Sequence, residues 1–437
     1  MYQPELAIAK VRLQSMDIVN LLNRLERTPF MTRTLVVILL QLIFALILSE
    51  CRASDDRPCR NVIERMTIPA QINHRPVRLI IDTGSDQCGL DTDILDSMGI
   101  KVTGQHSLIT PSRVITSAVR ELVDLQLEGR KTHRTAIVDL NVAVFRSYGL
   151  FQFDGLLGTN ILSHYVVTLT DGNIALHDAI PAEIDVHDLQ STEPMENARP
   201  VLPVVFPGVG EYRLRLDTGA NHTCRVRRDV FDALDRNGKV TRGLRSKAAD
   251  ASGSSSDQTW ILRELEVAGV RFQNVPLTIA RDNALGMELL SHLQLTIDFP
   301  QQRILIGRPH HEVVERFPMN SSGIALAFFA NDELKVIAVR TESAAGSAGI
   351  QTGDIVTQLN DNEPSSLSID EVDEILSRTG RTISIRLRRE SAEFTAELPL
   401  RLPFEYPPDW DEIGRRNQDF EDFLKAQGIG SPEPQQE

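Results

Sequence analysis

The chain lacks the features that mark several common classes of protein. Its four cysteines, Cys51, Cys59, Cys88 and Cys224, are too few for a disulfide framework and show no metal-ligand spacing. Basic residues do not predominate: 46 Lys and Arg stand against 60 Asp and Glu, and the net charge of −14 argues against nucleic acid as a partner. Neither a Gly-x-Ser-x-Gly elbow nor a His-Glu-x-x-His helix occurs, so serine and zinc hydrolysis have no support.

One long apolar run lies near the start of the chain. Residues 34–49 are apolar except for Gln41 and follow Arg33. The run is short for a membrane-spanning helix, which needs about twenty residues, and slightly long for a signal-peptide core. Both interpretations predict export of the rest of the chain. The segment is then either a membrane anchor or, if translation starts at Met31, a signal peptide cleaved after Ala53.

One tripeptide, Asp-Thr-Gly, occurs twice, each time at the end of an apolar stretch. Residues 78–84 read RLIIDTG and residues 213–219 read RLRLDTG. One copy alone is ordinary turn chemistry, because an Asp side chain accepts backbone N–H bonds and Gly permits positive φ. Two copies on matched strands predict that two carboxylates lie face to face.

A second repeat follows each tripeptide. Residues 157–168 align without gaps to residues 285–296, with six of twelve positions identical. The pattern between the repeats is one of short strands and turns, with a short helix after each tripeptide at 92–98 and 228–236. Closing strand pairs are expected at 166–176 and 294–306. Together these repeats indicate an internal duplication.

The two halves resemble the lobes of aspartic peptidases over about residues 62–308. Each has one Asp-Thr-Gly and one apolar-apolar-Gly turn, at 156–158 and 284–286. In size, the lobes resemble those of a fused retropepsin dimer more than those of pepsin. The resemblance implies a mainly β protein with duplicated acid-protease barrel lobes, and flaps are expected at 107–118 and 248–258.

By this resemblance, Asp82 and Asp217 are the catalytic dyad. Two carboxylates within hydrogen-bond reach share one proton, so one can take a proton from water while the other donates to the peptide carbonyl. This chemistry needs no metal and no cofactor, and the acidic cluster around Asp82 lacks the EF-hand spacing. The expected supporting residues are Thr83, Gly84, Ser85, Thr218, Gly219, Ala220, Gly158 and Gly286.

The residue after each tripeptide differs between the two halves. Ser85 follows the first copy and Ala220 follows the second. A hydroxyl at position 85 can stabilise an ionised Asp82, whereas Ala220 offers Asp217 nothing comparable. The sequence therefore predicts that Asp82 is the more acidic partner.

A different pattern begins near residue 321 and resembles a PDZ domain. Gly323, Ile324, Ala325 and Leu326 match the loop that receives a peptide carboxylate, and residues 344–360 match the signature that follows it. A helix is expected at 368–378, with a capping box formed by Ser368 and Glu371. A groove between this helix and the Ile324 strand would bind an extended peptide as an added strand. The alternative is a groove that is closed or serves only in packing.

The predicted domain organisation follows from these patterns. It comprises an N-terminal extension (1–53), a first lobe (60–183), a linker (184–199), a second lobe (200–308), a linker (309–320), a PDZ domain (321–402) and an acidic tail (403–437). We expect an exported, monomeric aspartic endopeptidase of a bacterial periplasm or cell envelope, acting on protein or peptide substrates. The alternative is a non-catalytic, membrane-tethered peptide-binding scaffold, whose Asp-Thr-Gly loops survive only as turns.

Overall fold

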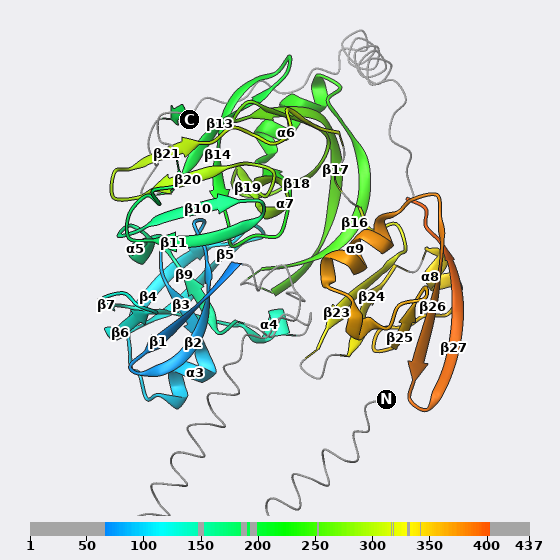
Figure 1. Ribbon diagram of the computed structural model, residues 1–437, viewed down its shortest axis with the longest axis horizontal. Coiled ribbons are helices and arrows are strands. Elements are labelled where there is room, and N and C mark those ends of the chain that lie inside the picture. The colour runs from blue at the N-terminus through cyan, green and yellow to red at the C-terminus, as the bar shows by residue number, and fades with distance from the viewer. Residues whose placement is uncertain are drawn as a thin grey trace, which may run out of the picture. The chain divides into compact units, whose positions relative to one another are not determined.

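The computed structural model describes residues 66–146, 153–184, 190–192, 199–250, 253–315, 317, 319–329, 333–340 and 342–402. This part of the chain is mainly β, as predicted, and its strands form four sheets (Figure 1). One sheet builds each lobe, one joins the two lobes, and one belongs to the C-terminal domain. The predicted apolar segment at 34–49 and the predicted tail at 403–437 lie outside the described residues.

The first lobe is built on a nine-stranded sheet. Its strands, in order across the sheet, are β4 (Val102–Ile109), β5 (Val114–Arg120), β8 (Val138–Leu140), β3 (Gly89–Asp91), β9 (Gly155–Leu157), β2 (Arg75–Ile81), β1 (Thr67–Ile72), β6 (Val123–Leu127) and β7 (Thr132–Thr135). β4 and β5 form a hairpin that contains the first predicted flap.

The second lobe is built on an eight-stranded sheet. Its strands, in order, are β16 (Val240–Asp250), β17 (Gly253–Val267), β13 (Val201–Phe206), β14 (Gly210–Asp217), β19 (Ala284–Gly286), β15 (Cys224–Val226), β18 (Val270–Ile279) and β22 (Val313–Val314). β17 also pairs with β18, so the sheet curves back on itself. The order β17-β13-β14-β19-β15 repeats the order β6-β1-β2-β9-β3 of the first lobe, as expected of an internal duplication.

A third sheet joins the lobes through their closing strands. Its order is β11 (Asn173–His177), β10 (Val166–Thr170), β20 (Leu295–Asp298), β21 (Arg303–Ile306) and β12 (Gln190–Thr192). β10 of the first lobe and β20 of the second lie antiparallel at its centre, with Thr168 opposite Thr296 (Figure 1). These two threonines occupy equivalent positions of the repeat, so a local two-fold axis passes between them.

The segments predicted as linkers are not only connectors. β12 lies within 184–199 and pairs with β21. β22 lies within 309–320 and pairs in parallel with β18. Each of these segments therefore adds an edge strand to a sheet.

The lobes share one core, and the C-terminal domain has another. β6 shows the pattern that builds the first core, because Val123, Leu125 and Leu127 are buried and the two residues between them are exposed. A continuous cluster of buried apolar side chains runs through both lobes, whereas the domain after Ser322 buries its own separate cluster. The two lobes therefore form one body around the third sheet.

Short helices complete the lobes. α3 (Thr92–Ser97) begins after Asp91, whose carboxylate accepts a hydrogen bond from Asp93 N at 2.8 Å. α6 (Arg228–Arg236) has the predicted bounds. The others are α4 (Ala143–Arg146), α5 (Thr159–Leu162) and α7 (Met287–Leu290). No helix in the described ranges is long and apolar enough to cross a bilayer.

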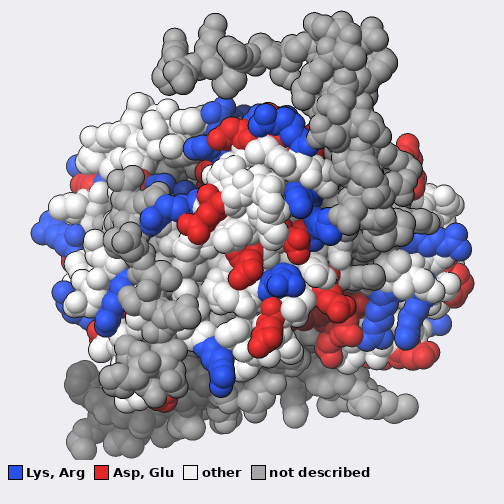
Figure 2. Space-filling view, turned by 90° about the horizontal axis from the view of Figure 1, so that it is seen from above, with Lys and Arg blue, Asp and Glu red and all other residues white. Residues whose placement is uncertain are grey.

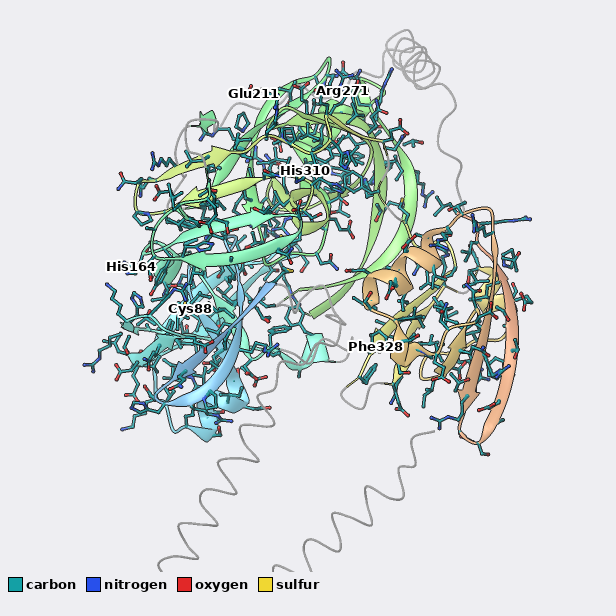
Figure 3. All side chains as sticks on the ribbon, in the orientation of Figure 1. Cys88, His164, Glu211, Arg271, His310 and Phe328 are labelled. Atoms are coloured by element: carbon teal, nitrogen blue, oxygen red, sulfur yellow. The ribbon has the colours of Figure 1, made fainter. Side chains whose placement is uncertain are left out.

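The C-terminal domain is a five-stranded sheet with short helices. The strands, in order, are β23 (Ile324–Phe328), β24 (Leu334–Val339), β25 (Ile355–Leu359), β26 (Thr382–Arg389) and β27 (Ala392–Pro399). The helices are α8 (Ala344–Ser347), the 3-10 helix η3 (Pro364–Ser366) and α9 (Ile369–Ser377). Ser368 and Glu371 form the predicted capping box at the start of α9. Phe328, at the end of β23, is buried (Figure 3).

Candidate active site

The two Asp-Thr-Gly loops begin at the ends of equivalent strands. Asp82 follows β2 directly, and Asp217 is the last residue of β14. Each of these strands pairs in parallel with the short strand of an apolar-apolar-Gly turn, β9 or β19. Since the pairing is the same in both lobes, the two aspartates emerge at corresponding points of the fold.

Four hydrogen bonds made by Thr83 and Thr218, two of them between these residues, hold the two loops together. Thr83 N donates to Thr218 Oγ1 at 3.1 Å, and Thr218 N donates to Thr83 Oγ1 at 3.2 Å. Each hydroxyl then donates to a carbonyl of the opposite lobe: Thr83 Oγ1 to Leu216 O and Thr218 Oγ1 to Ile81 O, both at 2.7 Å. Both threonines are buried, so these bonds fix the separation of the loops.

The glycines of the two loops let each aspartate lie against the opposite loop. A Cβ at Gly84 would be 2.4 Å from Asp217 Oδ1, and a Cβ at Gly219 would be 2.3 Å from Asp82 Cγ. Any side chain at either position would therefore displace the opposite carboxylate. The contacts bring Asp82 and Asp217 together across the interface of the lobes.

The predicted supporting turns hold the loops through backbone hydrogen bonds and close packing. Thr159 N, at the start of α5, donates to Ser85 O, and Met287 N, at the start of α7, donates to Ala220 O, each at 2.9 Å. Gly158 N donates to the buried Cys88 Sγ at 3.4 Å (Figure 3). A Cβ at Gly158 would be 2.4 Å from Gln87 O, and one at Gly286 would be 2.3 Å from His222 O. Glycine is therefore required at both turns.

The Asp82 carboxylate has few partners. Its Oδ1 accepts hydrogen bonds from Gly84 N at 2.8 Å and Ser85 N at 3.0 Å. Removal from water and the nearby charge of Asp217 raise the pKa of Asp82 to about 7, although Arg215 and the two backbone N–H groups act in the opposite direction. Asp82 therefore keeps its proton up to about neutral pH.

Asp217 has a different environment. Its Oδ2 accepts a hydrogen bond from Arg225 Nη2 at 2.6 Å and lies 3.6 Å from Arg215 Nη2. Burial alone would raise the pKa of Asp217, but the charges of Arg225 and Arg215 outweigh it, and the pKa lies below its ordinary value. Asp217 is thus the ionised member of the pair.

These contacts reverse the order of acidity predicted from the sequence. The Ser85 hydroxyl donates to Gln87 O at 2.9 Å, so its contribution to Asp82 is its backbone N–H alone. Asp217 instead gains a buried guanidinium, which stabilises an anion more than a neutral hydroxyl does. The prediction that Asp82 is the more acidic partner is therefore wrong.

Three residues of the second lobe were missed by the sequence analysis. Asp282 forms ion pairs with Arg225 Nε at 2.9 Å and Arg215 Nη2 at 2.5 Å. At the positions equivalent to Arg215 and Arg225, counted from the two Asp-Thr-Gly copies, the first lobe has the buried apolar residues Ile80 and Leu90. A residue-by-residue comparison of the two repeats would have revealed both exchanges of an apolar residue for arginine.

The first flap contacts the second lobe. At the tip of the β4–β5 hairpin, Pro111 O accepts from Arg281 N at 3.3 Å and Ser112 O accepts from Arg281 Nε at 3.4 Å. Ile109 and Val114, beside the tip, are exposed apolar residues. The hairpin therefore reaches across to the loop that also carries Asp282.

A cavity of about 290 Å³ lies between this hairpin and β8. Leu108, Ile115 and Leu140 contribute its apolar lining, and Asp139 contributes a carboxylate. Arg120 binds that carboxylate through Nε at 2.5 Å and Nη2 at 2.7 Å, so its charge is compensated. Neither Asp82 nor Asp217 lines this cavity.

The predicted carboxylate loop of the C-terminal domain is partly closed by its own side chains. Ile324 N donates to Ser322 Oγ at 3.2 Å, and Ile324 O accepts from Asn320 Nδ2 at 2.7 Å. Gly323 has φ +84°, and a Cβ there would be 2.2 Å from Ser343 Cβ. Ala325 and Leu326 continue β23, which is the edge strand of the sheet next to β24.

In the part of the chain that the structure describes, the charged groups outside the lobe interface form no metal site. Within the described ranges, no cluster of three or more His, Cys, Asp or Glu residues could hold a metal ion. On the face shown in Figure 2, acidic and basic side chains are interspersed among uncharged residues. A mixed face of this kind does not attract a polyanion strongly.

Comparisons with known proteins agree with both halves of this description. Residues 68–161 match the aspartyl protease family, and residues 335–389 match the PDZ domain. A search among curated proteins found no match to the chain. The family matches support a protease with a PDZ domain; the first match covers the loop of Asp82, and the likeness of the second lobe depends on the internal duplication.

Proposed function

We propose that this protein is an aspartic-type endopeptidase that hydrolyses peptide bonds with a water molecule activated between Asp82 and Asp217. The observation that carries the proposal is the reciprocal pair of hydrogen bonds between Thr83 and Thr218, which holds the two loops together. A protein that used these loops only as turns would have no need to lock them to each other.

The proposed reaction needs only water and the two carboxyl groups. The ionised carboxylate takes a proton from water, whose oxygen attacks the peptide carbonyl carbon, and the protonated carboxyl gives its proton to the carbonyl oxygen. The resulting tetrahedral diol collapses when the amide nitrogen receives the proton taken from water and the C–N bond breaks. One diol hydroxyl gives its proton to the carboxylate that had protonated the carbonyl oxygen, and this restores the dyad. The cavity between the β4–β5 hairpin and β8, with its lining of Leu108, Ile115 and Leu140, would hold a small apolar side chain of the substrate.

A cleavage assay on the full chain tests this function. Incubation with a peptide library at several pH values should yield products, and Asp82→Asn or Asp217→Asn should each reduce the rate about 10³-fold, because each removes one half of the acid–base pair. Asp171→Asn is a matched control, since Asp171 lies in the exposed turn between β10 and β11 with φ 51°, which Asn tolerates.

The same assay decides between the enzyme and a peptide-binding scaffold. If the folded protein binds peptides but cleaves none of them at any pH, the scaffold is the correct function. Cleavage that survives either Asp→Asn change would place the chemistry elsewhere in the chain.

We further propose that the PDZ domain binds peptide termini beside β23. Gly323→Val should weaken binding of a fluorescent peptide with a free C-terminal carboxylate about tenfold or more, which equals about 1.4 kcal/mol, because its side chain would meet Ser343 and β-branched residues resist positive φ. Fluorescence anisotropy of the full chain measures this. The same peptide with an amidated C-terminus is the control, and equal binding of both peptides would contradict capture of the carboxylate.

The cellular setting is also part of the proposal. Export to the bacterial periplasm or cell envelope, with residues 34–49 as a cleaved signal or a membrane anchor, would place both domains outside the cytoplasm. Fractionation of the producing cells, followed by N-terminal sequencing of the protein, distinguishes cleavage from anchoring. We expect a monomer, because one chain supplies both aspartates.

A further inference from the structure

The charges around Asp217 form a balanced set. Asp217 and Asp282 supply two negative charges, and Arg215 and Arg225 supply two positive ones, with ion-pair distances from 2.5 to 3.6 Å. Arg225 is 4% exposed, and Asp217 is 6% exposed. Protonation of Asp217 would leave a positive charge uncompensated in this buried cluster, and ionisation of Asp82 beside it would add an unbalanced negative one.

The orientation of the Asp217 carboxylate agrees with this balance. Oδ2 is occupied by Arg225, and Oδ1 is the oxygen that lies against Gly84 of the opposite loop. Oδ1 is therefore the atom of Asp217 that faces the interface of the lobes. On Asp82, Oδ1 accepts the two backbone hydrogen bonds, which leaves Oδ2 to carry a proton.

We propose that Arg225 is a positioning residue that assigns the two roles within the dyad: it holds Asp217 as the carboxylate that activates water and leaves Asp82 as the carboxyl that donates a proton. The assignment rests on the proposed function and specifies it. Asp217 Oδ1 takes the proton from water and later passes it to the leaving amine. Asp82 Oδ2 protonates the carbonyl oxygen and recovers its proton when the diol collapses.

The other charged and titratable groups near Asp217 do not oppose this assignment. They are Asp82, Arg215, Asp282 and His222. Burial, and then the charge of Arg225, lowers the pKa of His222 to about 3, so this imidazole is neutral when the dyad works. Arg215 contacts Asp217 at a longer distance than Arg225 does, which makes Arg225 the main partner.

The pH profile of cleavage tests the proposal. Arg225→Leu installs the residue that the first lobe has at the equivalent position, Leu90, and removes the charge that favours ionised Asp217. The acidic limb of the kcat/KM profile, which reports loss of the active carboxylate, should move up by about one pH unit or more. Arg225→Lys keeps the charge and should restore most of the wild-type profile. Thermal unfolding of each variant shows whether it is folded at the assay temperature.

A second measurement is independent of activity and of the folding of the Arg225 variants. The carboxyl ¹³C resonances of Asp-labelled full-length protein, assigned with Asp82→Asn and Asp217→Asn, should show Asp217 titrating below its ordinary range and Asp82 titrating near pH 7. If the wild-type protein cleaves peptides but Arg225→Leu leaves the acidic limb unchanged, or if Asp82 titrates first, the role of Arg225 is overturned and the endopeptidase stands. If nothing is cleaved, the endopeptidase fails and the titration alone decides the role of Arg225.

Discussion

Asp217→Asn should destabilise the protein by about 3 kcal/mol, whereas Asp82→Asn should not destabilise it at neutral pH. Breaking a buried ion pair on one side leaves the other charge uncompensated, which typically costs several kcal/mol. Asp217 is bound by Arg225 at 2.6 Å, so its replacement leaves that guanidinium paired with Asp282 alone. An amide at position 82 resembles the protonated carboxyl that the structure favours there.

The pH dependence follows from the two pKa shifts. The pKa of Asp82 is raised to about 7, so between its unfolded pKa and pH 7 the unfolded state loses this proton while the folded state keeps it, and stability falls progressively as pH rises. Asp82→Asn removes this loss and should be more stable than the wild-type protein at pH 8. The pKa of Asp217 is lowered, so its contribution is present above the unfolded value and is lost as pH falls through the folded pKa.

Urea unfolding followed through tryptophan fluorescence measures these differences. Trp260 reports on the second lobe, where its ring packs against that of Phe231 with the ring centroids 4.8 Å apart. Both variants should lose about 10³-fold in cleavage rate, so activity does not distinguish them but stability does. Equal destabilisation by the two changes, or a greater loss with Asp82→Asn, would contradict the assignment of charge.

Thr83→Val and Thr218→Val should each lower stability by about 3 kcal/mol and should also slow cleavage. Valine preserves the shape of the side chain but removes a hydroxyl that accepts one interlobe hydrogen bond and donates another. An N–H and a carbonyl oxygen then remain buried without partners, at about 1–3 kcal/mol each. Because the four bonds are reciprocal, the two variants should be affected almost equally.

Matched variants show whether the loss comes from the hydroxyl itself and whether it is specific to this buried site. Thr83→Ser keeps the hydroxyl and should retain most of the stability, while Thr132→Val on β7 changes the same chemical group at an exposed position. Urea midpoints and kcat/KM on one cleaved peptide give both readouts. A loss in Thr83→Ser as large as that in Thr83→Val would show that the packing of the methyl group, and not the hydrogen bonds, holds the loops.

The parts of the site that sequence reasoning found are those set by local backbone requirements. An Asp at the end of an apolar strand, followed by Thr and a Gly with no room for a Cβ, is recognisable because only those residue types satisfy the turn and its close contacts. The aligned repeat similarly located the closing pairs, and the capping box located α9.

The parts of the site and of the fold that the sequence did not predict depend on contacts between residues far apart in the chain. Asp282 lies more than fifty residues after Arg225, and no local pattern predicts that the two share a buried ion pair. Arg225 lies in a three-residue strand between Cys224 and Val226, where a charged side chain would normally point to water. β12 lies in a polar segment that contains proline, so the sequence predicts a linker there and gives no sign of its pairing with β21.

The pairing of β10 with β20 explains why the two halves of the active site can carry different residues. Thr168 lies opposite Thr296, so the two halves meet as two identical subunits would across a two-fold axis. In a homodimer of one such lobe, positions 90 and 225 would be encoded by the same codon, and an arginine placed on one aspartate would appear on both. Two buried guanidinium groups would then favour a doubly ionised pair that has no proton to give. A single chain removes that constraint, because a mutation in one half no longer enters the other.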